Sequence, residues 1–169
     1  MFWRAVPKKK FDPERHKFRV SSVAENKENI RAMVDIIAKH RPDAKVIFTV
    51  SPIPLGATFR PVSSMTANSV SKAILRAALD EVLRDLDADA NVHYWPSFEI
   101  VNDVFADVWT MDRRHVSPAV LDFVMTLFED NWCADSAPEV SSGERYVRAL
   151  IATKSLPQAL RPAYENMDL

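Results

Sequence analysis

The sequence predicts an α/β fold built around a parallel β-sheet. Helix-like and strand-like segments alternate along the chain, which is the order typical of this class. The segment Lys45–Ser51 is β-branched and almost wholly apolar, as expected of a strand that is buried on both faces. Two strands joined through a helix are parallel in nearly all known cases, so we expect parallel pairing with the next strand.

Two helices flank this strand. Ser22 and Glu25 match a capping box, and apolar residues then recur at helical spacing, which predicts a helix over residues 23–40. After the strand, either Asn68 or Ser69 is expected to cap a second helix that runs to about residue 86 and buries a stripe of leucine, isoleucine, valine and alanine.

The second strand is expected at Val92–Trp95, and two loops follow the strands, at residues 53–67 and 97–107. In open α/β sheets ligands bind at the carboxyl ends of the strands, where such loops lie. Ser117 as N-cap and Pro118 at the first helical position predict a third helix that ends near residue 132.

The domain prediction is an α/β unit over residues 1–133, followed by a linker and short helical tail over 134–169, with a helix near 144–153. Residues 18–20 could add a short strand. Even so, two strong strands and one doubtful one are too few for a parallel sheet. We therefore expect the fold to be incomplete at its N-terminal side, or to be completed by another chain.

Composition excludes several functions. The 22 basic and 23 acidic side chains nearly cancel, which argues against nucleic-acid and membrane-surface partners. Only 2 glycines are present, too few for a phosphate-binding loop or a nucleophile elbow. With 1 cysteine, no signal-peptide pattern and no membrane-length apolar run, we expect a cytoplasmic protein without an internal disulfide.

The candidate catalytic residues are Asp112 and His115. A histidine that acts as a general base needs an acceptor on its far nitrogen, which fixes the tautomer and stabilises the imidazolium. An aspartate three residues earlier in a tight loop can provide that acceptor. The alternatives are a loop histidine with a merely local hydrogen bond, and a metal site that adds His93, for which no ligand pair has metal-binding spacing.

Four segments together resemble the GSCFA family. They are Phe48–Pro54, Ala67–Arg76, Tyr94–Ile100 and Asp112–Pro118, and they occur in the family's order. The GSCFA family is similar to the SGNH, or GDSL-like, hydrolases and acyltransferases. The resemblance implies a three-layer, flavodoxin-like α/β fold and a Ser-His-Asp mechanism that needs neither cofactor nor metal.

In this resemblance His115 matches the family's C-terminal histidine, and Asp112 matches the aspartate before it. Val116 and Ser117 separate the histidine from Pro118, whereas the usual SGNH pattern has proline directly after histidine. The implied activity is ester hydrolysis or acyl transfer on a small or carbohydrate ester. Tyr94, Trp95 and Phe98 could line the substrate pocket, although such residues more often belong to a core.

The segment Gly-Ser-Cys-Phe-Ala that gives the family its name, and that carries its presumed nucleophile, is absent from the 169 residues. Met1–Arg4 resembles the region after the family's third block, with Trp3 as its tryptophan. We therefore expect the chain to be the C-terminal part of a GSCFA protein whose serine lies elsewhere, inactive by itself. Ser51 is a weak substitute, and Cys133 is expected to be a small buried residue. The alternative is a non-catalytic module that forms oligomers through an exposed sheet edge.

Overall fold

The computed structural model describes residues 8–87, 91–133 and 140–157. Within these residues, the strands Val46–Phe48 (β1) and Val92–Tyr94 (β2) pair in parallel, with Ile47 opposite His93. The predicted α/β class and the parallel pairing are confirmed. Both strands are shorter than predicted, and all six of their residues are only half-buried.

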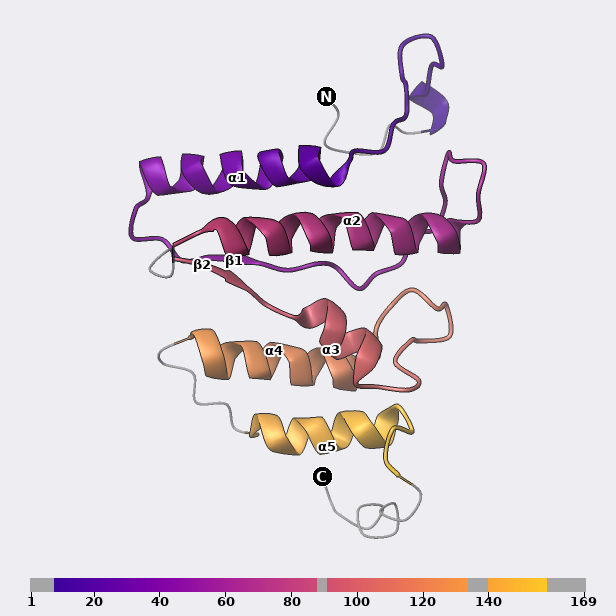
Figure 1. The fold of residues 1–169 in the computed structure, drawn as a ribbon. Coiled ribbons are helices and arrows are strands. Elements are labelled where there is room, and N and C mark those ends of the chain that lie inside the picture. Colours follow the sequence, from indigo (N-terminus) through magenta and orange to yellow (C-terminus); the bar gives the residue numbers. More distant parts are fainter. Residues whose placement is uncertain (1–7, 88–90, 134–139, 158–169) are drawn as a thin grey trace.

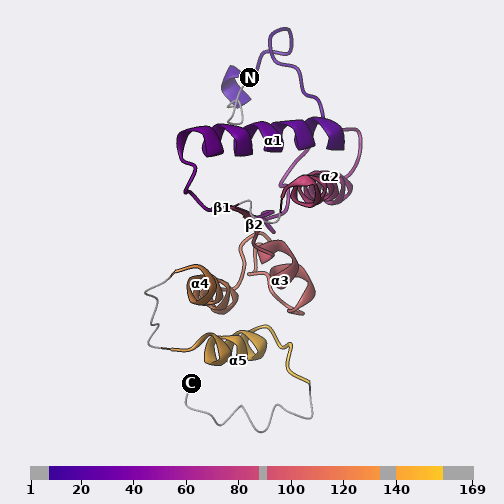
Figure 2. The same ribbon diagram turned by 60° about the vertical axis from the view of Figure 1, so that its left-hand side comes forward.

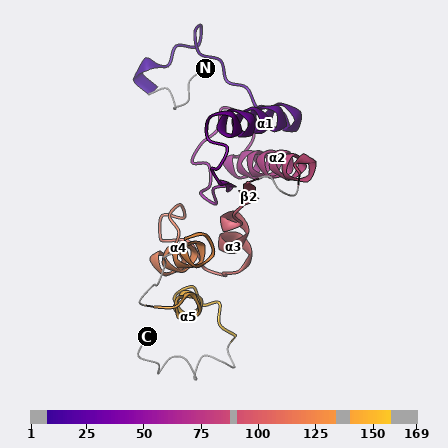
Figure 3. The same cartoon turned by 90° about the vertical axis from the view of Figure 1, so that its left-hand side faces the viewer.

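Five α-helices and one short 3-10 helix surround this strand pair in the described part of the chain. They are η1 (Lys8–Lys10), α1 (Val23–His40), α2 (Ser64–Asp85), α3 (Ser97–Asp103), α4 (Pro118–Trp132) and α5 (Ser142–Ala152). Helices α1 and α2 lie on one side of the strands, and α3 and α4 on the other, with α5 beyond α4 (Figures 1 and 2). Figure 3 shows the same arrangement, with α1 and α2 on one side of β2 and α3, α4 and α5 on the other.

Each side of the strand pair has its own hydrophobic core. On the α1–α2 side, Ile30 packs with Ala78, Leu79 and Val82, and Phe48 and Tyr94 of the strands close this core. On the other side, the buried residues come from α3, α4, α5 and the loop between α3 and α4: Val101, Phe105, Val108, Val116, Val120, Phe123, Val124 and Ala149. The strands therefore separate two apolar clusters.

The predicted ends of α1 and α4 agree with the structure. The Ser22 hydroxyl accepts a hydrogen bond from the Glu25 amide at 3.1 Å, as a capping box requires. Pro118 occupies the first turn of α4 behind Ser117, although the Ser117 side chain makes no capping bond. Proline is favoured there because it lacks the N–H that the first turn of a helix leaves unsatisfied.

Three local predictions were wrong. Helix α2 begins at Ser64, five or six residues earlier than predicted, because the Ser63 hydroxyl caps it by accepting from the Thr66 amide at 3.1 Å. The segment after β2, predicted to be a loop over 97–107, contains the helix α3. Residues 18–20 form no strand. The first turn of α2 was missed because it is solvent-exposed and so carries no apolar period, with Met65 80% exposed.

Helix α5 packs against α4 and shares its core. The Tyr146 ring contacts Phe105 and Phe123, with ring centroids 6.0 and 5.1 Å away. Beyond the helix, the Thr153 carbonyl accepts from the Asp107 amide at 3.1 Å. The helix predicted near 144–153 is thus present, and it supports the loop that leads to Asp112. The linker predicted to start at 134 falls largely on residues 134–139, outside the described residues, as does Trp3.

Candidate functional site

The loop from Thr110 to His115 is closed at its base by backbone pairing. Trp109 and Val116 form an antiparallel bridge, and the Thr110 amide donates to the His115 carbonyl at 2.8 Å. Val116 is buried in the core beside α4, and so is Val108, whose carbonyl accepts from the Ser117 amide at 2.7 Å. The base of the loop is therefore anchored in the hydrophobic core while its tip faces solvent.

Asp112 organises this loop. Its Oδ1 atom accepts from the Arg114 amide at 2.9 Å, from the His115 amide at 3.0 Å and from the Thr110 hydroxyl at 2.8 Å. These bonds, led by those from the His115 and Arg114 amides, hold the pKa of the Asp112 carboxyl far below its usual range. Asp112 is consequently an anion at any pH near neutrality.

The second oxygen of Asp112, Oδ2, is hydrogen-bonded to Nδ1 of His115. An ionised carboxylate can only accept, so the neutral imidazole must carry its proton on Nδ1. The lone pair of His115 then lies on Nε2, which makes no hydrogen bond within the described residues. The His115 side chain is 77% exposed. The structure thus brings together the two residues that the sequence singled out, with the imidazole oriented by the carboxylate.

The Arg114 side chain brings this loop close to Gly56, in the loop that follows β1. A Cβ atom built on Gly56 would lie 3.5 Å from Nη1 of Arg114. The neighbouring Leu55 amide donates to the side-chain oxygen of Asn68, on α2, at 3.1 Å. Three segments far apart in sequence thus converge here: the Asp112–His115 loop, the loop after β1, and the N-terminal part of α2.

Neither Ser51 nor Cys133 gains support as a nucleophile. The Ser51 hydroxyl accepts a local hydrogen bond from the Ile53 amide at 3.3 Å, as in a serine turn. No hydrogen bond joins His115 to a serine among residues whose structure is described. Cys133 was expected to be buried, which is wrong: it is exposed at the C-terminal cap of α4, where the apolar face of the helix has ended.

A half-buried polar cluster joins α2, β2 and α3, and the sequence interpretation missed it. Glu99 accepts from Nε of Arg76 at 2.9 Å and from the Tyr94 hydroxyl at 2.7 Å. The Arg76 guanidinium carbon also lies 4.3 Å from the centroid of the Tyr94 ring. Tyr94 thus belongs to a network that fixes α3 against α2. Arg76 and Glu99 are 23 residues apart in the sequence, and that spacing matches no known motif. Only the fold could therefore show that they pair.

Burial and neighbouring charges shift the pKa values of the Tyr94 hydroxyl and the Glu99 carboxyl. Burial raises the pKa of the Tyr94 hydroxyl, and its hydrogen bond to Glu99 adds to the effect. For Glu99, burial acts to raise the pKa, but the bonds from Tyr94 and Arg76 outweigh it, and the pKa is lowered. Lys72, one turn before Arg76 on the same helix face, has a pKa lowered by burial. No ion pair of Lys72 is found in the described part of the chain.

The other residues that the sequence suggested for a site, His93, Trp95 and Phe98, pack against neighbouring side chains or lie half-buried on a helix. The His93 ring packs on Trp132 with centroids 4.8 Å apart, and no cluster of metal-ligating side chains occurs among the described residues. Trp95 packs edge-on against Phe128 in the core of the α4 side, and Phe98 is half-buried on α3. The metal alternative and the pocket role of Trp95 therefore find no support in these contacts.

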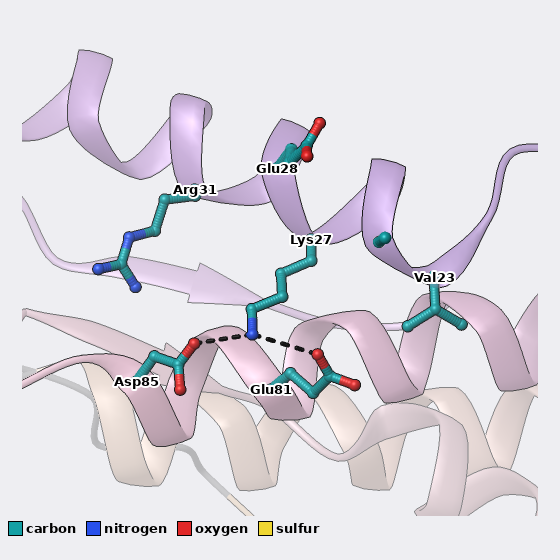
Figure 4. Close-up of a pocket in the computed structure, with 7 residues that line it drawn as sticks. Val23, Lys27, Glu28, Arg31, Glu81 and Asp85 are labelled. Atoms are coloured by element: carbon teal, nitrogen blue, oxygen red, sulfur yellow. Dashed lines mark ion pairs between the residues drawn. The ribbon is translucent and has the colours of Figure 1, made fainter.

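A pocket of about 650 Å³ lies between α1 and α2, away from the Asp112–His115 loop. Figure 4 shows the Lys27 ammonium group between the carboxylates of Glu81 and Asp85, at 3.2 and 2.8 Å. Both hydrogen bonds and charge attraction raise the pKa of Lys27. Because Lys27 is already paired, this surface resembles an interhelix ion-pair network more than a ligand site.

The fold and this loop define an α/β protein with a hydrogen-bonded aspartate–histidine pair, in a loop whose Arg114 side chain lies near the loop after a parallel strand. The chain belongs to the GSCFA family, whose model matches residues 2–128. No curated protein and no solved structure shows a significant match to the chain. Among the residues described, no helix is long and apolar enough to cross a membrane.

Proposed function

We propose that Asp112 and His115 form the general-base half of an SGNH-type esterase or O-acyltransferase. The observation that carries this proposal is the bond from His115 Nδ1 to an aspartate whose other oxygen is held by three donors. That arrangement leaves Nε2 as an exposed proton acceptor. Membership of the GSCFA family agrees with the proposal, and an exposed, unpaired Cys133 fits the cytoplasmic compartment expected from the sequence.

In the proposed reaction a serine supplied from outside these 169 residues approaches Nε2. As the serine oxygen attacks the acyl carbon of the ester, its proton passes to Nε2, and the charge of the imidazolium is balanced by Asp112. The imidazolium then gives this proton to the departing alkoxide. In the second half, Nε2 takes a proton from water for hydrolysis, or from an acceptor hydroxyl for transfer, as that oxygen attacks the acyl carbon. The bond from the acyl carbon to the serine oxygen then breaks, and the imidazolium returns the proton to the serine. Neither metal nor organic cofactor takes part.

A fluorophosphonate probe, which labels activated serines, tests this proposal. The 169-residue chain alone should stay unlabelled. A protein that also carries a Gly-Ser-Cys-Phe-Ala segment should be labelled, and the variant His115→Ala should lose that labelling. Labelling of the chain alone at any serine contradicts an external nucleophile, and labelling that survives His115→Ala contradicts the role of the histidine.

The second candidate is a non-catalytic module that associates through its sheet edge. It is favoured by the two short strands, each of which has one edge without a strand partner within the described residues. Sedimentation equilibrium distinguishes the candidates. A stable dimer that dissociates when Ile47→Pro removes a strand N–H, together with no labelling in any longer protein, would support the module.

A further inference from the structure

A second cavity of about 390 Å³ lies between three segments: residues 18–21 before α1, residues 55–60 after β1, and the first turns of α2. We call it the Phe59 groove, after the most exposed ring in its wall. Its lining includes Phe18, Val20, Leu55, Phe59, Arg60 and Ser71. Ligand sites typically have this size and this combination of apolar walls with a few polar groups.

The groove presents apolar side chains to solvent. Phe59 is 73% exposed, and its ring contacts those of Phe11 and Phe18 at centroid distances of 5.5 and 5.7 Å. The apolar side chains of Phe18, Val20 and Leu55 are also exposed to solvent. Contiguous exposed apolar surface of this kind marks a binding site more often than an isolated exposed residue does.

The charge in the groove is positive. Arg19 is bound to Glu25, so its charge is balanced. Arg60 makes no ion pair within the described residues, although its backbone amide is held by the Thr58 hydroxyl at 3.1 Å. Arg60 is half-buried and lines the groove beside its apolar walls. A guanidinium there favours a ligand with both an apolar chain and an anionic oxygen pair, because guanidinium binds carboxylate through two parallel hydrogen bonds.

The groove adjoins the Asp112–His115 loop. Leu55 and Ala57, which line it, flank Gly56, and the Arg114 guanidinium lies near Gly56. We propose that the Phe59 groove binds a straight-chain carboxylate of roughly six to ten carbons, with its carboxylate on Arg60. Such a carboxylate is the acid that hydrolysis of the corresponding acyl ester releases. This deepens the proposed function, on which its link to His115 rests, by naming the acyl class.

Binding of octanoate to the isolated chain tests the assignment without any need for catalysis. In two-dimensional NMR titrations, octanoate should shift the amides of residues 18–21 and 55–60. Full burial of one methylene is worth roughly a fourfold change in affinity, so a fully buried pair is worth roughly fifteenfold. In this open groove each further pair of methylenes, from hexanoate to decanoate, should tighten binding about threefold or more, up to that value. Acetate lacks the apolar chain and 1-octanol lacks the carboxylate, so both should bind more weakly than octanoate.

Variants locate the site. Phe59→Ala should weaken octanoate binding at least about tenfold, because a major part of the apolar wall is lost. Arg60→Gln should remove the preference for octanoate over 1-octanol. Ile36→Ala, which truncates an exposed apolar residue of α1 outside the groove, is the matched control and should bind as the parent does. Circular dichroism verifies that each variant is folded.

Acetate binding as tightly as octanoate, or shifts confined to other surfaces, would overturn the proposal. So would equal effects of Phe59→Ala and Ile36→Ala. The variant His115→Ala separates this proposal from the catalytic one, since it should abolish serine labelling in the longer protein while leaving octanoate binding unchanged. Loss of octanoate binding in a folded His115→Ala chain would also overturn the groove assignment.

Discussion

Nδ1 of His115 is hydrogen-bonded to Oδ2 of Asp112, while Oδ1 of the same carboxylate accepts three further bonds from within the loop. Asp112 therefore both shapes the loop and orients the imidazole. The two roles can be separated by experiment, because asparagine keeps an acceptor oxygen for the loop but places an amide where a negative charge stood.

Asp112→Asn should change the tautomer of His115. In the parent, nitrogen NMR of the ring should show the proton on Nδ1. In the variant, an amide facing Nδ1 can donate to it, so the fraction with the proton on Nε2 should rise. Asp107→Asn, in the same loop region but away from the imidazole, should leave the ring spectrum unchanged. An unaltered tautomer in Asp112→Asn would contradict the assigned role.

The Asp112 carboxyl should remain ionised in acid. Its pKa in the folded chain lies below that of the unfolded chain, so its stabilising effect is present above about pH 4, the ordinary aspartate range, and is lost as the pH falls towards the folded value. Carbon NMR of the carboxyl group should show this. Thr110→Val removes one donor and should raise the pKa. No change in Thr110→Val would contradict the hydrogen-bond explanation.

Glu99→Ala should destabilise the fold. It removes the acceptor of both Arg76 and the Tyr94 hydroxyl in a half-buried site, and we expect a loss of roughly 1–3 kcal/mol in the free energy of unfolding by urea. Arg84→Ala, which breaks a more exposed pair with Asp80 on α2, is the control and should cost about 0.5 kcal/mol or less. Similar losses in the two variants would argue against a structural role for the cluster.

Lys72→Met should be tolerated, with an effect that depends on pH. The folded pKa of Lys72 is lowered by burial, so the charged amine opposes folding at pH values below its unfolded pKa, and this cost falls as the pH rises through the folded value. Replacement by methionine should therefore stabilise the chain at neutral pH more than at alkaline pH. Urea unfolding at several pH values measures this, and an opposite trend would indicate a bound anion at Lys72.

Two substitutions in α5 should act in opposite directions. Tyr146→Ala removes a ring from the core shared with α4 and should cost about 3 kcal/mol or more. Gly143→Ala should stabilise the chain by roughly 0.5–1 kcal/mol, because it lies within the helix and a Cβ there meets nothing nearer than 3.9 Å. Thermal unfolding checks both. A neutral Tyr146→Ala would indicate that α5 is not part of the folded unit.

The sequence was sufficient where the determining interactions are local. The cap formed by Ser22 and Glu25, the proline that opens α4, and the spacing of Asp112 and His115 each involve neighbours within three residues. The physical rules for caps and for histidine orientation act at that range, so these features were recognisable without a fold.

The sequence was insufficient where the interacting residues are far apart along the chain or where the helix is short. Helix α3 has seven residues and no side-chain cap, too little for a periodic signal. The hydrogen bond between Arg76 and Glu99 depends on how α2 and α3 pack together, and the approach of Arg114 to Gly56 depends on how two loops pack together. The apolar groove at Phe59 is likewise assembled from three separate segments.

All the hydrogen bonds found to orient the His115 ring come from residues 110–115, and the base is closed by residues 108–117. The aspartate–histidine pair is therefore a self-contained unit of one short hairpin. A synthetic peptide of residues 108–117, cyclised across its ends, should retain part of this hydrogen-bonded geometry. Such a unit could be transplanted between scaffolds or inherited as a single segment, whereas a pair assembled from two distant loops could not.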